Sequence, residues 1–127
     1  MNRRSINAAD APGATGGYSQ AVEIVNAARL LFISGQIPVA VDGRVPETFR
    51  EQCLLAWANV EAQLRAAGMS FDNLVKVTTF LSDRRFADEN GNVRRQVLGA
   101  YAPALTVIIT GIFDPAWLVE IEAIAAI

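Results

Sequence analysis

Residues 48–81 read TFREQCLLAWANVEAQLRAAGMSFDNLVKVTTFL, and this stretch decides the fold because a helix pattern is followed closely by a strand pattern. Apolar residues recur at the spacing of one helix face at Phe49, Cys53, Trp57, Val60, Leu64 and Ala67. Thr48 and Glu51 form a capping-box pattern before this helix, and Gly68 is a natural end. Residues 74–81 contain several β-branched residues and predict a strand.

The flanking segments extend this order in both directions. Before the first helix, the patterns predict strands at residues 3–7, 19–25 and 30–34, with the last two forming a hairpin. After residue 81, they predict a helix at about 86–99 and strands at 106–110 and 118–125. We therefore expect one α+β domain over residues 1–127, with a mixed six-stranded sheet and two helices on one face.

Composition narrows the class of protein. The chain has 127 residues, of which 52% are hydrophobic, and its 11 basic and 13 acidic residues make a nucleic-acid binder improbable on electrostatic grounds. The absence of histidine excludes histidine-based catalysis, and one cysteine excludes an internal disulfide. No apolar run is long enough for a membrane helix, and no signal-peptide pattern is present, so we expect a cytoplasmic protein. The high apolar content favours an oligomer.

Polar residues within apolar segments are candidates for a site. Asn90 lies on the apolar stripe of the second helix, where it either fixes a loop or shapes a pocket. Glu120 and Glu122 share one face of the last strand, which is either a solvated face or a source of a general acid or base. Ser34 and Gly35 follow a strand and form either an ordinary turn or a site for a small anion or carbonyl.

Two further features are interpreted as structural. The arginine pairs Arg84–Arg85 and Arg94–Arg95 are expected at solvated helix ends. Cys53 lies on the apolar face of the first helix and is expected to be an inert core thiol.

Several segments together resemble the RidA/YjgF family, which is also called the L-PSP endoribonuclease family. In chain order they are APGATGGYSQAV at 11–22, FISGQIP at 32–38, EQCLLAWANVEAQLRAAG at 51–68, LVKVTTFLSD at 74–83 and LVEIEAIA at 118–125. The resemblance implies a chorismate-mutase-like fold and a homotrimer whose sheets form a central barrel, with three clefts between subunits. It also implies hydrolysis of reactive imines and enamines such as 2-aminoacrylate, with no metal or organic cofactor.

The same resemblance assigns roles to residues of this chain. It places Tyr18 and Asn90 in the cleft, and Ser34 with Gly35 at a strand end beside the reacting group. Glu120 matches the glutamate that positions or activates the attacking water.

One position departs from the family pattern. The deaminating members carry an arginine that grips the substrate carboxylate, and Leu105 stands at that position in Pro103-Ala104-Leu105-Thr106. Leucine has no hydrogen-bond donor, so we expect weak or absent 2-aminoacrylate deaminase activity. The sequence therefore favours an imine or enamine hydrolase with a different substrate. The alternatives are a non-catalytic trimer that binds a metabolite or acts as a chaperone-like scaffold, and, least favoured, a ribonuclease.

Overall fold

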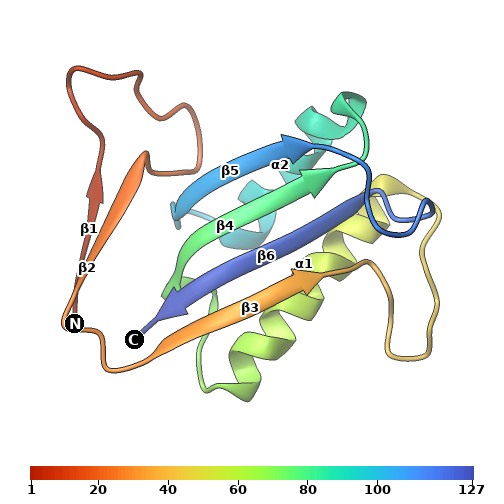
Figure 1. Ribbon diagram of the computed structural model, residues 1–127, viewed down its shortest axis with the longest axis horizontal. Helices are drawn as coiled ribbons and strands as arrows, with labels where there is room; N and C mark the ends of the chain where they lie inside the picture. Colours follow the sequence, from red (N-terminus) through yellow and green to blue (C-terminus); the bar gives the residue numbers. More distant parts are fainter.

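A four-stranded mixed sheet forms one layer of the structure, and two helices cover its rear face (Figure 1). The computed structural model describes residues 1–127. The strand order is β3 (Leu30–Gln36), β6 (Val119–Ala126), β4 (Leu74–Leu81) and β5 (Ala104–Ile109). β4 and β5 are parallel, whereas β6 pairs antiparallel with both β3 and β4. The α+β class and the order of the elements are confirmed.

The helices begin and end close to the predicted positions. α1 spans Phe49–Ala66 and α2 spans Ala87–Leu98; short 3₁₀ helices at Phe71–Asn73 and Arg84–Phe86 lead into β4 and α2. The Thr48 hydroxyl accepts a hydrogen bond from the backbone N–H of Glu51 at 3.2 Å, which satisfies one of the free amides at the start of α1. Neither helix is long and apolar enough to cross a membrane.

The six strands are divided between two sheets. β1 (Asn2–Ile6) and β2 (Ala21–Val25) form an antiparallel ribbon that stands to one side of the main sheet (Figure 1). Ser19 joins this ribbon to the domain, because its backbone N–H donates to Pro103 O at 3.0 Å and its hydroxyl to Ala102 O at 2.6 Å. The predicted hairpin of residues 19–25 with 30–34 was wrong, since β2 pairs with β1 and β3 pairs with β6. Both strands have long-range partners that local periodicity does not reveal.

The core lies between the sheet and the helices. Trp57, Val60 and Leu64 of α1 are almost fully buried against this layer. Along β6 the burial alternates: Val119, Ile121, Ala123 and Ala125 face the helices, whereas Glu120, Glu122 and Ile124 face away from them. The predicted separation of the two faces of this strand is therefore confirmed.

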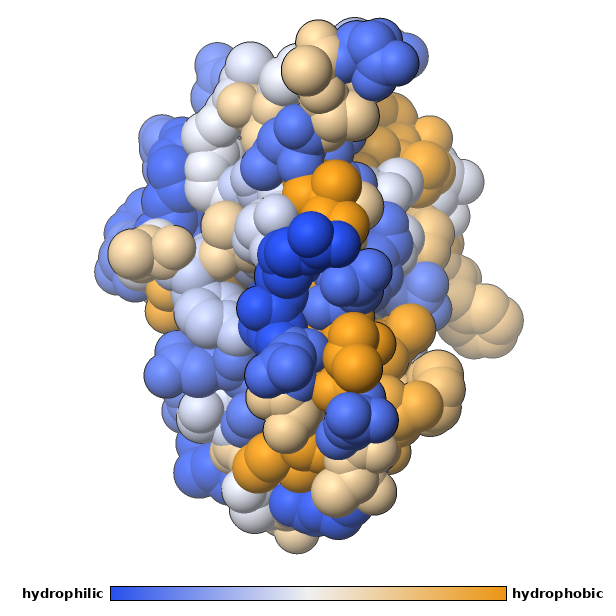
Figure 2. Space-filling model, turned by 90° about the vertical axis from the view of Figure 1, so that its left-hand side faces the viewer, coloured by the Kyte–Doolittle hydropathy of each residue, from blue (hydrophilic) through white to orange (hydrophobic).

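The face of the sheet opposite the helices is open and partly apolar. Phe32 and Leu30 are 72% and 58% exposed on β3, and Ile124 lies on the neighbouring strand. Figure 2 looks onto the β1–β2 end, and apolar residues gather on its right-hand side, toward the face that is in front in Figure 1. An exposed apolar sheet face of this kind is typical of a surface that another subunit covers.

Candidate functional site

The Glu120 cluster consists of Gly35 and Glu120, which β3 and β6 bring together. Ser34 precedes Gly35 on β3, but its side chain lines the neighbouring pocket that contains Glu122. The register between these strands shifts between Ile33 and Gln36, so the two intervening residues bulge out of the regular pairing. A Cβ atom on Gly35 would overlap the Glu120 carboxylate, and it would lie only 2.8 Å from Glu120 Cδ. Glycine is therefore the residue that lets the carboxylate lie against the backbone of the bulge.

A small cavity of about 220 Å³ adjoins Glu120. Phe80 of β4 and Phe113 of the β5–β6 connection supply apolar walls, and Glu120 supplies the charged group. Phe113 is itself 94% exposed, so the cavity opens at the surface of the single chain. A half-buried carboxylate beside an apolar wall has the chemical character of a general acid or base site.

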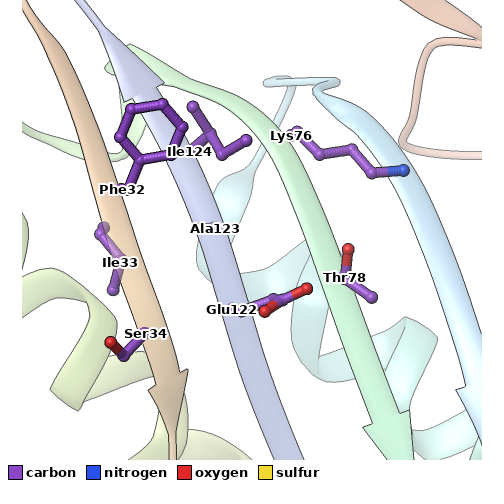
Figure 3. Close-up of a pocket in the computed structure, with 8 residues that line it drawn as sticks. All are labelled: Phe32, Ile33, Ser34, Lys76, Thr78, Glu122, Ala123 and Ile124. Atoms are coloured by element: carbon purple, nitrogen blue, oxygen red, sulfur yellow. The ribbon is translucent and has the colours of Figure 1, made fainter.

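Glu122 occupies a separate pocket of about 290 Å³ on the open face (Figure 3). Its carboxylate points toward Thr78, while Phe32 and Ile124 close the other end. Lys76 extends toward β5, where its Nζ donates to Thr106 Oγ1 at 2.6 Å. Glu120 and Glu122 therefore share a face, as predicted, but line different pockets.

The second group of predicted residues gathers behind β5. Asn90 is only 2% exposed on α2, and its Oδ1 accepts a hydrogen bond from the Cys53 thiol, with Sγ at 3.8 Å. It lines a groove of about 500 Å³, here called the Asn90 groove, together with Gly91, Arg94 and Arg95 of α2 and Val107 of β5. The loop of Gly16, Gly17 and Tyr18 closes over the two arginines: Arg94 donates to Gly16 O at 3.4 Å, and a Cβ on Gly17 would lie 3.2 Å from Arg95 Cγ.

Leu105 lies on the helix-facing side of β5, where it is half-buried and packs against the apolar core. Val107, two residues further along the same face, is the β5 residue that lines the Asn90 groove. Leu105 thus presents an apolar side chain that packs against the core.

Arg94 is the residue that the sequence interpretation placed wrongly. It is 7% exposed and lies within the Asn90 groove rather than at a solvated helix end, whereas Arg95 is exposed as expected. Burial lowers the pKa of Arg94, and the charge of Arg95 lowers it further, while Tyr18 and Cys53 act in the opposite direction. The signal was available in the sequence, because Arg94 follows Asn90 by one helical turn and so shares its face.

The Glu120 cluster and the Asn90 groove do not meet within one chain. The cluster lies on β6 and the edge strand β3, whereas the groove lies between α2 and the opposite edge strand β5. The structure brings together no group of three or more histidine, cysteine, aspartate or glutamate side chains that could hold a metal ion. These features define a small α+β domain with a carboxylate cluster toward one edge of its sheet and a polar groove at the other.

The chain belongs to the RidA/YjgF family. The sequence profile of the family described as Endoribonuclease L-PSP matches residues 8–127. A 2-iminobutanoate/2-iminopropanoate deaminase of Capra hircus is 37% identical over 125 residues, which cover 97% of this chain and 89% of that protein.

Two solved structures show the same fold. A Rid-family protein of unknown function from Yersinia pestis, YyfB, has a TM-score of 0.83 at 29% identity, with complete coverage of both chains. Escherichia coli TdcF, solved with bound serine, has a TM-score of 0.74 at 31% identity, with 98% of each chain covered.

Proposed function

We propose that this protein hydrolyses an imine or enamine, and that Glu120 is the residue that handles the proton. The observation that carries this proposal is the placement of Gly35, whose missing side chain leaves room for the Glu120 carboxylate at the bulge of β3. A fixed carboxylate beside an apolar cavity suits acid–base chemistry in a chain without histidine. The deaminase named among the relatives supports the same reaction class.

The chemistry needs only water and one group that can exchange a proton. An enamine first becomes an imine by moving one proton from nitrogen to carbon. Glu120 takes a proton from water as the water oxygen attacks the imine carbon, and it gives this proton to nitrogen, so that a neutral carbinolamine forms. The carboxylate then takes the hydroxyl proton of the carbinolamine and transfers it to nitrogen as the carbon–nitrogen bond breaks, and ammonia and a carbonyl product leave. We assign to Ser34 and the backbone of Gly35 the role of holding the polar end of the reacting group. The contact of Gly35 with this carboxylate supports its part, whereas Ser34 lines the adjacent pocket of Glu122.

The complete site requires neighbouring subunits. We propose a homotrimer in which the Glu120 cluster of one subunit faces the Asn90 groove of the next, with Tyr18 and Asn90 shaping the shared cleft. The position of the two groups at opposite edges of one sheet supports this arrangement, as does the apolar open face around Phe32.

Substrate choice differs from that of the arginine-bearing relatives. Leu105 offers no donor at the family position and packs into the core. Loss of a paired carboxylate contact of about 3 kcal/mol lowers turnover by roughly 100-fold. Turnover of 2-aminoacrylate is therefore expected to be weak or absent.

The test is ammonia release from freshly generated imines, using a panel that includes 2-aminoacrylate and larger imino acids. Glu120→Gln should lower turnover of the best substrate by about 100-fold or more, because glutamine cannot exchange the proton. Glu122→Gln is the matched control, since Glu122 lies on the same strand face in a different pocket, and should retain activity.

A folded trimer that accelerates no member of the panel would contradict the proposal and favour the non-catalytic alternative. Equal activity of wild type and Glu120→Gln would contradict the role of Glu120. Turnover of 2-aminoacrylate near that of an arginine-bearing relative would contradict the altered substrate choice.

A further inference from the structure

Arg94 is a buried cation without a counter-charge. No carboxylate oxygen lies within 4.0 Å of its guanidinium, and the three ion pairs in the structure involve other residues. Its Nε has no hydrogen-bond partner, and one terminal nitrogen makes only a long contact of 3.4 Å to Gly16 O. A buried guanidinium is normally paired and fully hydrogen-bonded, because removing its charge from water is costly.

The surroundings leave this charge uncompensated. Arg95 follows directly and adds a second positive charge at the same groove. Asp88 also lines the groove, but it is exposed and forms no ion pair with either arginine. Asn90, one turn before Arg94 on α2, supplies a buried amide on the same wall. The groove therefore combines a buried donor fork, an amide and a net positive charge.

The β5 wall of the groove is apolar. Val107 lines it, and Leu105 lies two residues before Val107 on the same face of β5, a distance of about 7 Å along the strand. Both β5 side chains on this face are apolar, so the guanidinium of Arg94 on α2 supplies hydrogen-bond donors to a groove to which β5 contributes none.

We propose that Arg94 is the anchor for a carboxylate-bearing ligand, which it binds from α2 through its planar donor fork with Asn90 beside it. This inference deepens the proposed function, on which it rests for the identity of the cleft, and it names a small carboxylate as the substrate class. The anchor is displaced from the family position, so a small 2-imino acid binds without aligning its reacting carbon at Glu120. Carboxylate binding and turnover are accordingly separate measurements.

Calorimetric titration with pyruvate and 2-oxobutanoate tests the anchor directly. The wild type should bind at least one of these two carboxylates, and it should bind pyruvamide, the uncharged analogue of pyruvate, at least tenfold more weakly. Arg94→Met should lose roughly tenfold or more in affinity, because a hydrogen bond to a charged group is lost, and Arg94→Lys should lie between the two. Arg84→Gln is the matched control, since Arg84 is an exposed arginine outside the groove, and should bind as the wild type does.

Thermal unfolding separates an anchor from a structural arginine. Without ligand, Arg94→Met should keep or raise the melting temperature, because it removes an uncompensated buried charge. With saturating carboxylate, the wild type should be stabilised and Arg94→Met should not. The proposal is overturned if the wild type binds neither carboxylate, if Arg94→Met binds as well as the wild type, or if Arg94→Met fails to fold or to assemble while Arg94→Lys is normal. If binding follows these expectations and no imine is hydrolysed, the anchor stands and the proposed reaction does not.

Discussion

At the scale of single residues, Cys53 shows how burial sets chemistry. Its side chain is fully buried in α1, and its thiol donates to Asn90, on the wall of the groove. Burial raises the pKa of this thiol to about 12, and the nearby charge of Glu89 acts in the same direction. The thiol is therefore neutral and unreactive at neutral pH, and it helps to orient the Asn90 amide.

The raised pKa of Cys53 predicts a loss of stability in alkali. The unfolded thiol loses its proton above its ordinary pKa of 9.0, whereas the folded thiol keeps it up to about 12, so unfolding becomes easier as pH rises between these values. Between pH 8 and 10.5 the wild type should lose about 2 kcal/mol more unfolding free energy than Cys53→Ala does. Denaturant unfolding of both proteins at matched concentration measures this difference. Parallel pH profiles would contradict it.

The sequence predicted which face of a helix or strand a residue occupies better than it predicted which distant segments cover that residue. The burial of Asn90 and the orientation of Glu120 followed from helical and strand periodicity, and the structure agrees with both. The burial of Arg94 was not predicted, because charged pairs on helices are usually solvated. The loop of Gly16 and Gly17 that covers Arg94 also comes from a distant part of the chain. The proximity of Gly35 to Glu120 likewise depends on a pairing between strands far apart in sequence.

At the scale of elements, the bulge in β3 is the feature on which the Glu120 cluster depends. Between Ile33 and Gln36, β3 contains one residue more than the segment of β6 that it pairs with. Gly35 lies in this bulge, against the Glu120 side chain. A bulge next to a functional side chain is a recurrent way of aiming that side chain. Its geometry tolerates no Cβ at residue 35 unless the carboxylate moves.

Gly35→Ala should therefore both destabilise the fold and displace Glu120. Overpacking of this kind costs about 1–3 kcal/mol, which lowers the melting temperature by several degrees. Imine hydrolysis should fall with it. Gly13→Ala is the control, because a Cβ there meets no atom within 4 Å and its backbone is not in the left-handed region. An unchanged melting temperature and activity in Gly35→Ala would contradict this account of the bulge.

The elements themselves were predicted with differing success. β4 was predicted with its observed bounds, because its β-branched residues are flanked by clear ends. β5 begins at Ala104 rather than Thr106, since pairing with β4 extends it beyond the apolar run. The β1–β2 ribbon was mispaired, because the partner of β2 lies across a loop of more than a dozen residues that carries no pairing signal.

At the scale of the whole molecule, the single chain exposes two kinds of surface that another subunit could cover, one apolar and one polar. The open sheet face exposes Phe32 and Leu30, and burial of each would contribute roughly 1.5–3 kcal/mol to association. The Glu120 cluster and the Asn90 groove lie toward opposite edges of the sheet and open to the surface of the single chain. The proposed homotrimer, a closed ring, would cover the first surface and join the second, and this is the central claim of the proposed function.

The most direct test is cross-linking between two differently marked chains. Ser34→Cys marks the β3 strand end directly before Gly35 of the Glu120 cluster, and Val107→Cys marks the Asn90 groove. Both positions are exposed, and the native Cys53 is buried and unreactive. The two chains are coexpressed, and the mixed assemblies are treated with a short bismaleimide. We predict a covalent dimer of one chain of each kind, and little or none from either chain alone, with sedimentation showing a trimer throughout. An intact trimer that yields no mixed cross-link would contradict a site shared between subunits.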